Sequence, residues 1–270
     1  MGILNVTPDS FSGDGLLAPD PGRPEEGAAR AVRQAEAMVE GGADILDIGG
    51  ESTRPGHAPV SEAEETDRIA PVIRAVRAAL PEVPISIDTT KPRVAEAALD
   101  AGADLVNDVW GVDADDSLVR LAGERGVPIV LMHNRAEPRY RDLIGEVIDD
   151  LRRALDRALA SGVPLDNLIV DPGFGFGKTP AHNLELLRDL AALTILGRPI
   201  LLGTSRKSTL GRVLDLPADQ RLEATLATTA LAIAAGVDIV RVHDVRENVR
   251  AARLADAVVR ATWPADGGAS

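Results

Sequence analysis

The stretch Val237-Asp-Ile-Val-Arg-Val-His-Asp244 combines alternating apolar residues with two basic ones. The alternation predicts a β-strand, and Arg241 and His243, two residues apart, share one of its faces. Strands inside α/β proteins are usually apolar on both faces, and a buried cation without a partner is costly. We therefore expect both basic side chains to take their partners from a bound ligand that has an aromatic face and an anionic end.

The same unit of sequence recurs along the chain: a glycine that ends a helix, a short loop, a strand and a polar strand end. Glycine suits the first position because it readily adopts the left-handed conformation that stops a helix. Including Gly236–His243, the copies and three further apolar segments give eight predicted strands: Gly2–Val6, Gly42–Gly49, Val83–Asp88, Gly102–Asp108, Gly126–His133, Leu168–Asp171, Gly197–Gly203 and Gly236–His243.

Helical patterns lie between these strands, at residues 24–40, 61–80, 91–101, 114–125, 140–161, 181–196, 219–235 and 246–261. In the fifth pattern an apolar stripe recurs every four residues, and the charged residues between are expected to face solvent; the stripe is Leu143, Val147, Leu151, Leu155 and Leu159, and the charges are Asp149, Asp150, Arg152 and Arg153.

Eight strands alternating with eight helices are typical of the α/β class and of a (β/α)8 TIM barrel with its active site at the C-terminal ends of the strands. An open doubly wound sheet fits less well, because Asn5-Val-Thr-Pro-Asp9 stands where a Gly-x-Gly-x-x-Gly turn would be expected. We expect one domain over residues 1–263 and a flexible tail over 264–270.

Composition excludes several classes of partner. A net charge of −13 disfavours nucleic acid and membrane surfaces, which need a basic patch. The absence of cysteine excludes disulfides and thiolate metal sites and suits a reducing cytosol. No signal peptide and no apolar run long enough to span a bilayer are evident. The chain is therefore expected to be cytoplasmic, with small molecules as substrates.

The rarer residues gather at predicted strand ends. Only three of the 29 basic residues are lysines, namely Lys91, Lys178 and Lys207, and there are four histidines. The lysines and His57, His133, His182 and His243 all end or follow strands, as do five of the six aromatic residues. Because barrel enzymes place their active sites at this end, the clustering predicts one site there.

Three polar residues end apolar strands: Asp88, Asn107 and Asp171. Together a carboxylate and an amide can match the donor and acceptor edge of a heterocycle, although each residue could instead cap a helix or fix a loop. Lys207, in a segment that begins a helix, could donate to a ring carbonyl or form a Schiff base, or could simply be solvated.

Two further features are less specific. The segment Phe174-Gly-Phe-Gly-Lys178 could wall a pocket for a flat ligand or serve ordinary loop packing, and it lacks Walker A spacing. Asn5 offers an oxygen that could join Mg²⁺ on a phosphate. His57 and His182 are interpreted as surface or capping residues, and no cluster has the spacing of a zinc site.

Eight motifs in this order resemble the dihydropteroate synthase family, the folate-pathway enzymes that sulfonamides inhibit. From residue 2 to about 255 they read MGILNVTPDSFS, DIGGESTRPG, ISIDTTK, NDVWG, VLMHNR, DPGFGFGKT, LLGTSRKS and VRVHDV. The resemblance implies transfer of a 7,8-dihydropterin-6-ylmethyl group from its diphosphate to 4-aminobenzoate, with release of pyrophosphate by an SN1-like route. It also implies Mg²⁺ and a homodimer.

The resemblance also implies roles for individual residues. The pterin would contact Asp88, Asn107, Val109, Met132, Asp171, Phe176, Gly203, Lys207 and Arg241. The diphosphate would contact Asn5, Thr53, Arg54, Arg241 and His243, with Asn5 also reaching the metal. The aminobenzoate would contact Thr7, Pro8, Phe11, Arg54, Pro55, Phe176, Lys207 and Ser208. Of these, Asp88, Lys207, Arg241 and His243 would be catalytic.

Two departures from the family pattern stand out. The acidic residue of the first loop is shifted to Asp14, which puts its pairing with Arg54 in doubt. The chain also begins at the first strand, which implies a shorter barrel floor or a trimmed chain.

Two alternative functions fit the motifs less well. One is a pterin-dependent methyltransferase, which would not need the Ser-Arg-Lys and Arg-Val-His segments. A non-catalytic pterin-binding relative would not need Thr7, Phe11, Arg54 and Pro55.

Overall fold

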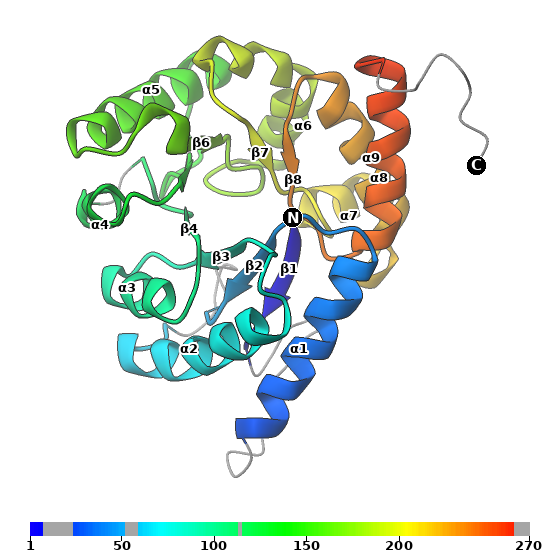
Figure 1. The fold of residues 1–270 in the computed structure, drawn as a ribbon. Helices are drawn as coiled ribbons and strands as arrows, with labels where there is room; N and C mark the ends of the chain where they lie inside the picture. The colour runs from blue at the N-terminus through cyan, green and yellow to red at the C-terminus, as the bar shows by residue number, and fades with distance from the viewer. Residues whose placement is uncertain (8–23, 52–58, 113–114, 262–270) are drawn as a thin grey trace.

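Eight short parallel strands form the centre of the computed structural model, which describes residues 1–7, 24–51, 59–112 and 115–261 (Figure 1). Six strands pair in chain order, namely β1 (Gly2–Asn5), β2 (Leu46–Gly49), β3 (Ile85–Asp88), β4 (Leu105–Asp108), β5 (Ile129–Met132) and β6 (Leu168–Asp171). The remaining two, β7 (Leu201–Leu202) and β8 (Ile239–Val240), form a second parallel pair.

Single bridges join the two groups of strands into a ring. Val170 of β6 pairs with Ile200, directly before β7, and Gly2 of β1 pairs with Val242, shortly after β8. At the second bridge the N–H of Ile3 donates to the carbonyl of Val242 at 3.0 Å. Every strand therefore has two parallel neighbours, and the predicted (β/α)8 barrel is confirmed.

Helices cover the outside of the strands (Figure 1). The α-helices of the described residues are α1 (Pro24–Glu40), α2 (Glu62–Ala79), α3 (Pro92–Asp100), α4 (Ser117–Arg125), α5 (Leu143–Ala160), α6 (Pro180–Arg188), α7 (Ser208–Leu214), α8 (Leu222–Ala234) and α9 (Val245–Val259). Three 3₁₀-helices join them, η1 (Leu165–Asn167), η2 (Leu190–Leu196) and η3 (Ala218–Gln220). Within the described part of the chain, no helix is both long and apolar enough to cross a bilayer.

Two helical predictions need correction. The pattern at 181–196 divides into α6 and η2, because Leu190 and Leu193 are both buried and their spacing of three matches a 3₁₀ turn. The short helix α7 is not among the predicted patterns, although the sequence does predict a helix start at Ser205–Ser208. The other helices lie within a few residues of their predicted positions.

The barrel interior has an apolar layer below a polar one. Met1, Leu105, Val130 and Leu201 pack together with Ile45, Ile169 and Ile239. Because side chains two residues apart on a strand share a face, the next inward layer toward the carboxyl ends consists of Asp47, Asn107, Met132, Asp171, Gly203 and Arg241. We call this end the mouth of the barrel.

Helix α5 does not keep its whole apolar stripe buried. Leu143, Val147 and Leu151 are buried, whereas Leu159 is 43% exposed. A spacing of four exceeds the helical repeat of 3.6, so the stripe turns by roughly 40° at each step. The expectation that Asp150 faces solvent is also wrong, because its carboxylate contacts His133 and Arg135.

Candidate active site at the mouth of the barrel

Arg241 forms two ion pairs inside the barrel. Its Nε donates to Oδ2 of Asp47 at 2.6 Å, and its Nη2 donates to Oδ2 of Asp88 at 2.7 Å. Asp47 and Asp88 belong to β2 and β3, so the guanidinium reaches from the last strand toward the second and third. The expectation that a ligand supplies the partner of Arg241 is therefore wrong, since two protein carboxylates do so.

Asn107 joins the same group of residues. Its Nδ2 donates to Oδ2 of Asp47 at 3.3 Å, and Asn107 pairs in register with Asp88 on the neighbouring strand. We call Asp47, Asp88, Asn107 and Arg241 the mouth cluster. Among the described residues Oδ1 of Asp88 has no hydrogen-bond partner, although it is buried. A buried carboxylate oxygen of this kind is suited to accept an N–H from a ligand.

Burial also sets the protonation of Asp88. Loss of water raises the pKa of this carboxyl to about 7, with Arg241 opposing the rise and Asp47 adding to it. Near neutral pH the group is therefore close to the point where it gains or loses a proton. Hydrogen bonds from ligand N–H groups would favour the ionised form.

Lys207 and Asp171 face the mouth from its other side. Lys207 is the N-cap residue of α7, its Nζ donates to the carbonyl of Phe174, and it lies 4.3 Å from the centre of the Phe176 ring. Oδ1 of Asp171 accepts the N–H of Gly173 at 2.7 Å. Burial lowers the pKa of Lys207 to about 8, opposed by the charge of Asp171. Burial raises the pKa of Asp171, opposed mainly by Lys207.

The glycine-rich loop lets Lys207 approach closely. Gly175 has φ +84°, and a Cβ there would lie 2.8 Å from Cδ of Lys207. A larger residue would therefore be strained and would displace the lysine. Phe174 is fully buried in the core, whereas Phe176 is partly exposed beside Lys207. Of the two phenylalanines, Phe176 is thus the one placed to contact a ligand.

A second buried network supports this loop from behind. Nζ of Lys178 donates to the carbonyls of Gly173 and Phe176 at 3.1 and 3.2 Å, and it lies 2.9 Å from Nδ1 of His133. Nε2 of His133 lies 3.1 Å from Oδ2 of Asp150. Burial lowers the pKa of His133 to about 3, so the ring is neutral, accepts from Lys178 and donates to Asp150. We call Lys178, His133 and Asp150 the loop support.

The remaining lysine, Lys91, is bound by two carboxylates. Nζ of Lys91 lies 2.5 Å from both Glu51 and the fully buried Glu65. These contacts join the segment after β2 to α2, and they are structural. His182 forms a capping box with Thr179 at the start of α6, which confirms its interpretation as a capping residue.

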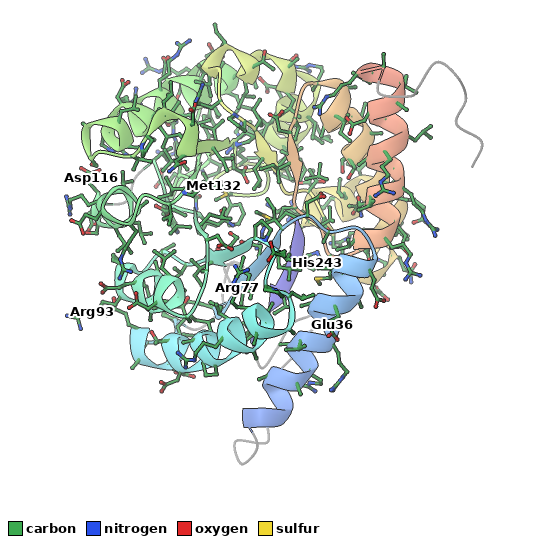
Figure 2. All side chains as sticks on the ribbon, viewed as in Figure 1. Glu36, Arg77, Arg93, Asp116, Met132 and His243 are labelled. Atoms are coloured by element: carbon green, nitrogen blue, oxygen red, sulfur yellow. The ribbon has the colours of Figure 1, made fainter. Side chains whose placement is uncertain are left out.

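His243 is hydrogen-bonded to Ser205, in the loop that follows β7. Oγ of Ser205 accepts the backbone N–H of His243 at 3.1 Å and lies 3.0 Å from Nδ1 of its ring. When this hydroxyl donates its proton to Nδ1, the ring proton is on Nε2. Figure 2 labels His243 and Met132 in the central part of the molecule, while Arg93 and Asp116 lie at its periphery.

The other predicted site residues divide into two groups. Asn5 and Gly203 end or follow strands at the mouth, Thr7, Val109 and Met132 are buried there, and Ser208 is exposed at the first residue of α7. The predictions for Pro8, Phe11, Asp14, Thr53, Arg54, Pro55 and His57 fall outside the described residues.

Asp47 and Ser205 are contacts that the sequence-based site omits. Asp47 lies between Leu46 and Ile48 in a strand that is buried throughout. A carboxylate in that position requires a cation, just as Arg241 in β8 requires an anion. Two such misplaced charges in one predicted barrel would have been enough to suggest that they pair.

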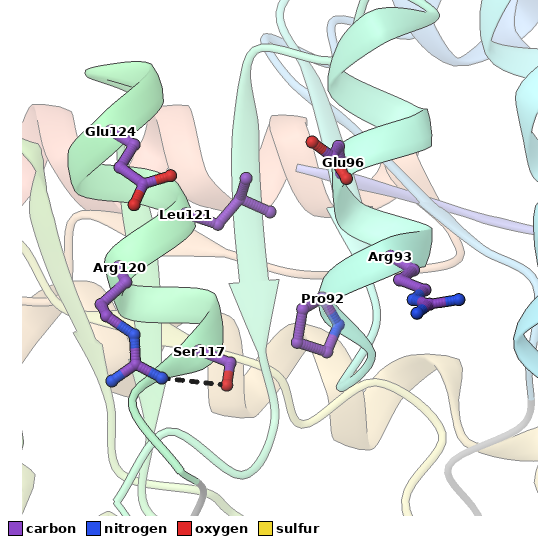
Figure 3. Close-up of a pocket in the computed structure, with 7 residues that line it drawn as sticks. All are labelled: Pro92, Arg93, Glu96, Ser117, Arg120, Leu121 and Glu124. Atoms are coloured by element: carbon purple, nitrogen blue, oxygen red, sulfur yellow. Dashed lines mark hydrogen bonds between the residues drawn. The ribbon is translucent and has the colours of Figure 1, made fainter.

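A concave surface also lies on the outside of the barrel, between α3 and α4 (Figure 3). It is lined by Pro92, Arg93, Glu96, Ser117, Arg120, Leu121 and Glu124. Arg120 donates to Ser117 at 3.2 Å, and the remaining charges are of both signs. This groove is formed by helices and is distinct from the mouth.

Comparison with known proteins agrees with this geometry. The family described as pterin binding enzyme matches residues 1–243. A dihydropteroate synthase of Clostridium beijerinckii is 47% identical over 96% of this chain and 94% of its own length, and that of Bacillus subtilis is 48% identical over 96% and 88%. The solved structure of the Clostridium difficile enzyme in the presence of pteroic acid has a TM-score of 0.90, with 48% identity over 96% of each chain.

A structure of the Xanthomonas albilineans enzyme with 4-aminobenzoic acid has a TM-score of 0.88, with 39% identity over 98% of this chain and 93% of that one. The chain therefore belongs to the pterin-binding enzymes, and it has the (β/α)8 barrel and the polar mouth described above. Within that class its function is that of the dihydropteroate synthases, which are transferases of folate biosynthesis.

Proposed function

We propose that the mouth binds 6-hydroxymethyl-7,8-dihydropterin diphosphate and transfers its pterin-methyl group to the amine of 4-aminobenzoate. The observation that carries this proposal is the convergence of Asp88, Asn107 and Arg241 in one hydrogen-bonded cluster, with Lys207 and Asp171 facing it. Pteroic acid and 4-aminobenzoic acid in the structures of relatives are consistent with the proposal.

In this proposal the edge of the pterin is read by Asp88, Asn107, Asp171 and Lys207. The two carboxylates accept ring and amino N–H groups, Asn107 both gives and accepts, and the ammonium donates to the ring carbonyl. The guanidinium of Arg241 stacks on one ring face. The remaining walls of the pocket are formed by Val109, Met132, Phe176 and Gly203.

The diphosphate is proposed to lie against Asn5, Arg241 and His243, with Thr53 and Arg54 completing its site. Nε2–H of His243 can donate to a phosphate oxygen, because Ser205 occupies Nδ1. Asn5 ends β1 at the mouth and offers one amide oxygen. That donor set fits Mg²⁺, which commonly keeps most of its waters and takes few protein ligands beside a substrate phosphate. When bound, the ion would neutralise charge on the leaving diphosphate.

We propose the following bond changes. The bond between the pterin methylene carbon and the diphosphate oxygen breaks, and pyrophosphate leaves with the electron pair. The amine nitrogen of 4-aminobenzoate attacks the resulting pterin-methyl cation and then loses a proton to water. The carboxylates of Asp88 and Asp171 stabilise the cation electrostatically. No strong general base is required, because the weakly basic aniline nitrogen loses its proton readily after attack.

The aminobenzoate is proposed to bind beside the pterin, at Thr7, Phe176, Lys207 and Ser208. The ring of Phe176 lies against the Lys207 ammonium, which leaves a wall that is apolar on one side and cationic on the other. Pro8, Phe11, Arg54 and Pro55 complete this proposed subsite.

Pyrophosphate release tests the proposed function directly. Release from the pterin diphosphate should depend on added 4-aminobenzoate and should match the dihydropteroate formed. A protein that binds the pterin but releases no pyrophosphate would be a non-catalytic relative. A protein that transferred a methyl group instead would be a pterin-dependent methyltransferase.

Replacing Asn5 with alanine tests the proposed metal contact. We expect Asn5→Ala to raise the Mg²⁺ concentration needed for half-maximal rate by about tenfold, since one ligand is lost. The measurement is kcat/KM for the pterin diphosphate as a function of MgCl₂. An unchanged metal dependence would assign Asn5 to another role.

We propose that the chain forms a homodimer. Leu254 and Val258, one turn apart on α9, are 69% and 75% exposed, and Leu231 on α8 is 58% exposed. Apolar side chains this exposed on neighbouring helices are suited to an interface. Sedimentation equilibrium should give twice the chain mass, and Leu254→Glu should shift it toward the monomer. A monomeric wild-type protein would refute the proposed homodimer.

We also propose a cytoplasmic location, which the absence of cysteine supports.

A further inference from the structure

We propose that Asp47 is a positioning residue that determines how the mouth recognises the pterin, although it touches no substrate atom. This inference rests on the proposed function. One oxygen of its carboxylate, Oδ2, accepts hydrogen bonds from two of the proposed pterin contacts, Arg241 at 2.6 Å and Asn107 at 3.3 Å.

The depth of Asp47 explains why it cannot be a direct contact. The residue is fully buried, and its register partner on β3 is Ser86. Asn107, by contrast, pairs with Asp88, two residues closer to the mouth. Measured along β3, Asp47 therefore lies two residues deeper than Asp88, and none of its surface is exposed.

The contact with Asp47 fixes which atoms Asn107 presents. An ionised carboxylate accepts hydrogen bonds and repels another oxygen, so the amide nitrogen of Asn107 must face Asp47. The amide oxygen is thereby directed away from the carboxylate. Without Asp47 the amide could rotate and exchange its donor and acceptor, which would remove its match to one heterocycle edge.

The same carboxylate fixes the plane of the Arg241 guanidinium. Asp47 binds Nε and Asp88 binds Nη2, and two contacts at different nitrogens leave a planar group little freedom to turn. A guanidinium that stacks on a ring must keep one plane. Asp47 thus orients both a stacking group and an edge-reading group.

The first test is Asp47→Asn, which keeps the volume and removes the charge. With each substrate varied at saturating levels of the other, we expect KM for the pterin diphosphate to rise by about ten- to a hundredfold, the range for loss of a hydrogen bond to a charged group. KM for 4-aminobenzoate should stay within about twofold. Asp104→Asn is the matched control, because it removes an ion pair with Arg77 at the opposite end of β4.

The second readout is the pH profile of kcat/KM for the pterin diphosphate. The pKa of Asp88 is lowered by the charge of Arg241 after β8, and it is raised by the charges of Asp47 on β2, Glu65 on α2 and Asp108 on β4. The charge of Asp47 raises the pKa of Asp88, so Asp47→Asn should move the acidic limb to lower pH. Asp47→Glu keeps the charge but displaces the oxygen, so it should raise the pterin KM and leave the acidic limb in place. A role in folding alone would not separate these two variants.

An unchanged pterin KM together with an unmoved acidic limb in Asp47→Asn would overturn the inference. If that variant does not fold, Asp47→Glu decides by its pterin KM, and an unchanged value overturns the inference equally. A wild-type protein that forms no dihydropteroate would instead refute the proposed function. The two failures are therefore distinguishable.

Discussion

The mouth cluster and the loop support are both buried groups of charged residues, but they differ in how completely their polar atoms are paired. In the loop support both ring nitrogens of His133 and Nζ of Lys178 have partners. In the mouth cluster Oδ1 of Asp47 and Oδ1 of Asp88 have none among the described residues, and the pKa of the Asp88 carboxyl is raised to about 7. Burial of charge is thus common to both groups, and the mouth cluster differs from the loop support in having unpaired oxygens, of which Oδ1 of Asp88 belongs to the residue nearer the mouth.

Replacing Lys207 with methionine should give the largest difference between the two groups. We expect Lys207→Met to lower kcat/KM by about two to three orders of magnitude, as for the loss of one preorganised donor at a reacting group. The melting temperature should not fall, because burial already disfavours the charged form of this lysine. Steady-state kinetics and calorimetry measure the two effects. Equal losses in both would make Lys207 a structural residue.

Replacing Asp150 with alanine should have the opposite balance. The side chain of Asp150 is only 11% exposed, and it is the common acceptor of His133 and Arg135. The variant removes that acceptor. We expect the free energy of unfolding in urea to fall by about 3 kcal/mol, the range for breaking a buried pair. The adjacent Asp149→Ala is the control, because Asp149 is 62% exposed and its loss should cost less than about 0.5 kcal/mol. Similar losses of unfolding free energy in the two variants would contradict a stabilising role for Asp150 in the loop support.

The pH dependence of kcat/KM provides the smallest and most specific difference. Asp88 must be ionised and Lys207 protonated, so the rate should rise through about pH 7 and fall through about pH 8. Lys207→Arg should remove the alkaline limb, since a guanidinium stays charged. Asp150→Ala should leave both limbs where they are. An alkaline limb that persists in Lys207→Arg would assign it to another group.

The sequence predicted the barrel because its signals are local. A helix-ending glycine, a short apolar strand and a polar strand end are visible within each repeat, and Gly42, Gly102 and Gly236 do have the expected positive φ. The same local signals put Asp88, Asn107 and Arg241 at the mouth. Which of these side chains pair with one another could not be read from one repeat, because each contact joins different strands.

The residues that were misjudged show the same limit. Asp150 has the spacing of an exposed helix residue, yet it meets His133 from the end of β5. In the sequence Asp47 resembles the other acidic residues of the strands. Its ion pair with Arg241 depends on closure of the barrel, which brings the end of β8 close to β2. Helix α7 is only seven residues long, which is too short for a periodic pattern to be evident.

The seam of the ring gives the ion pairs of Arg241 a mechanical role as well. Strands β7 and β8 are two residues each, and single bridges join them to β6 and β1, so local opening of the barrel should begin there. Arg241 follows β8 and forms ion pairs with Asp47 of β2 and Asp88 of β3, which lie beyond β1. These ion pairs connect the two sides of the seam inside the barrel. Occupancy of the mouth should consequently slow amide hydrogen exchange at Val240 and Val242.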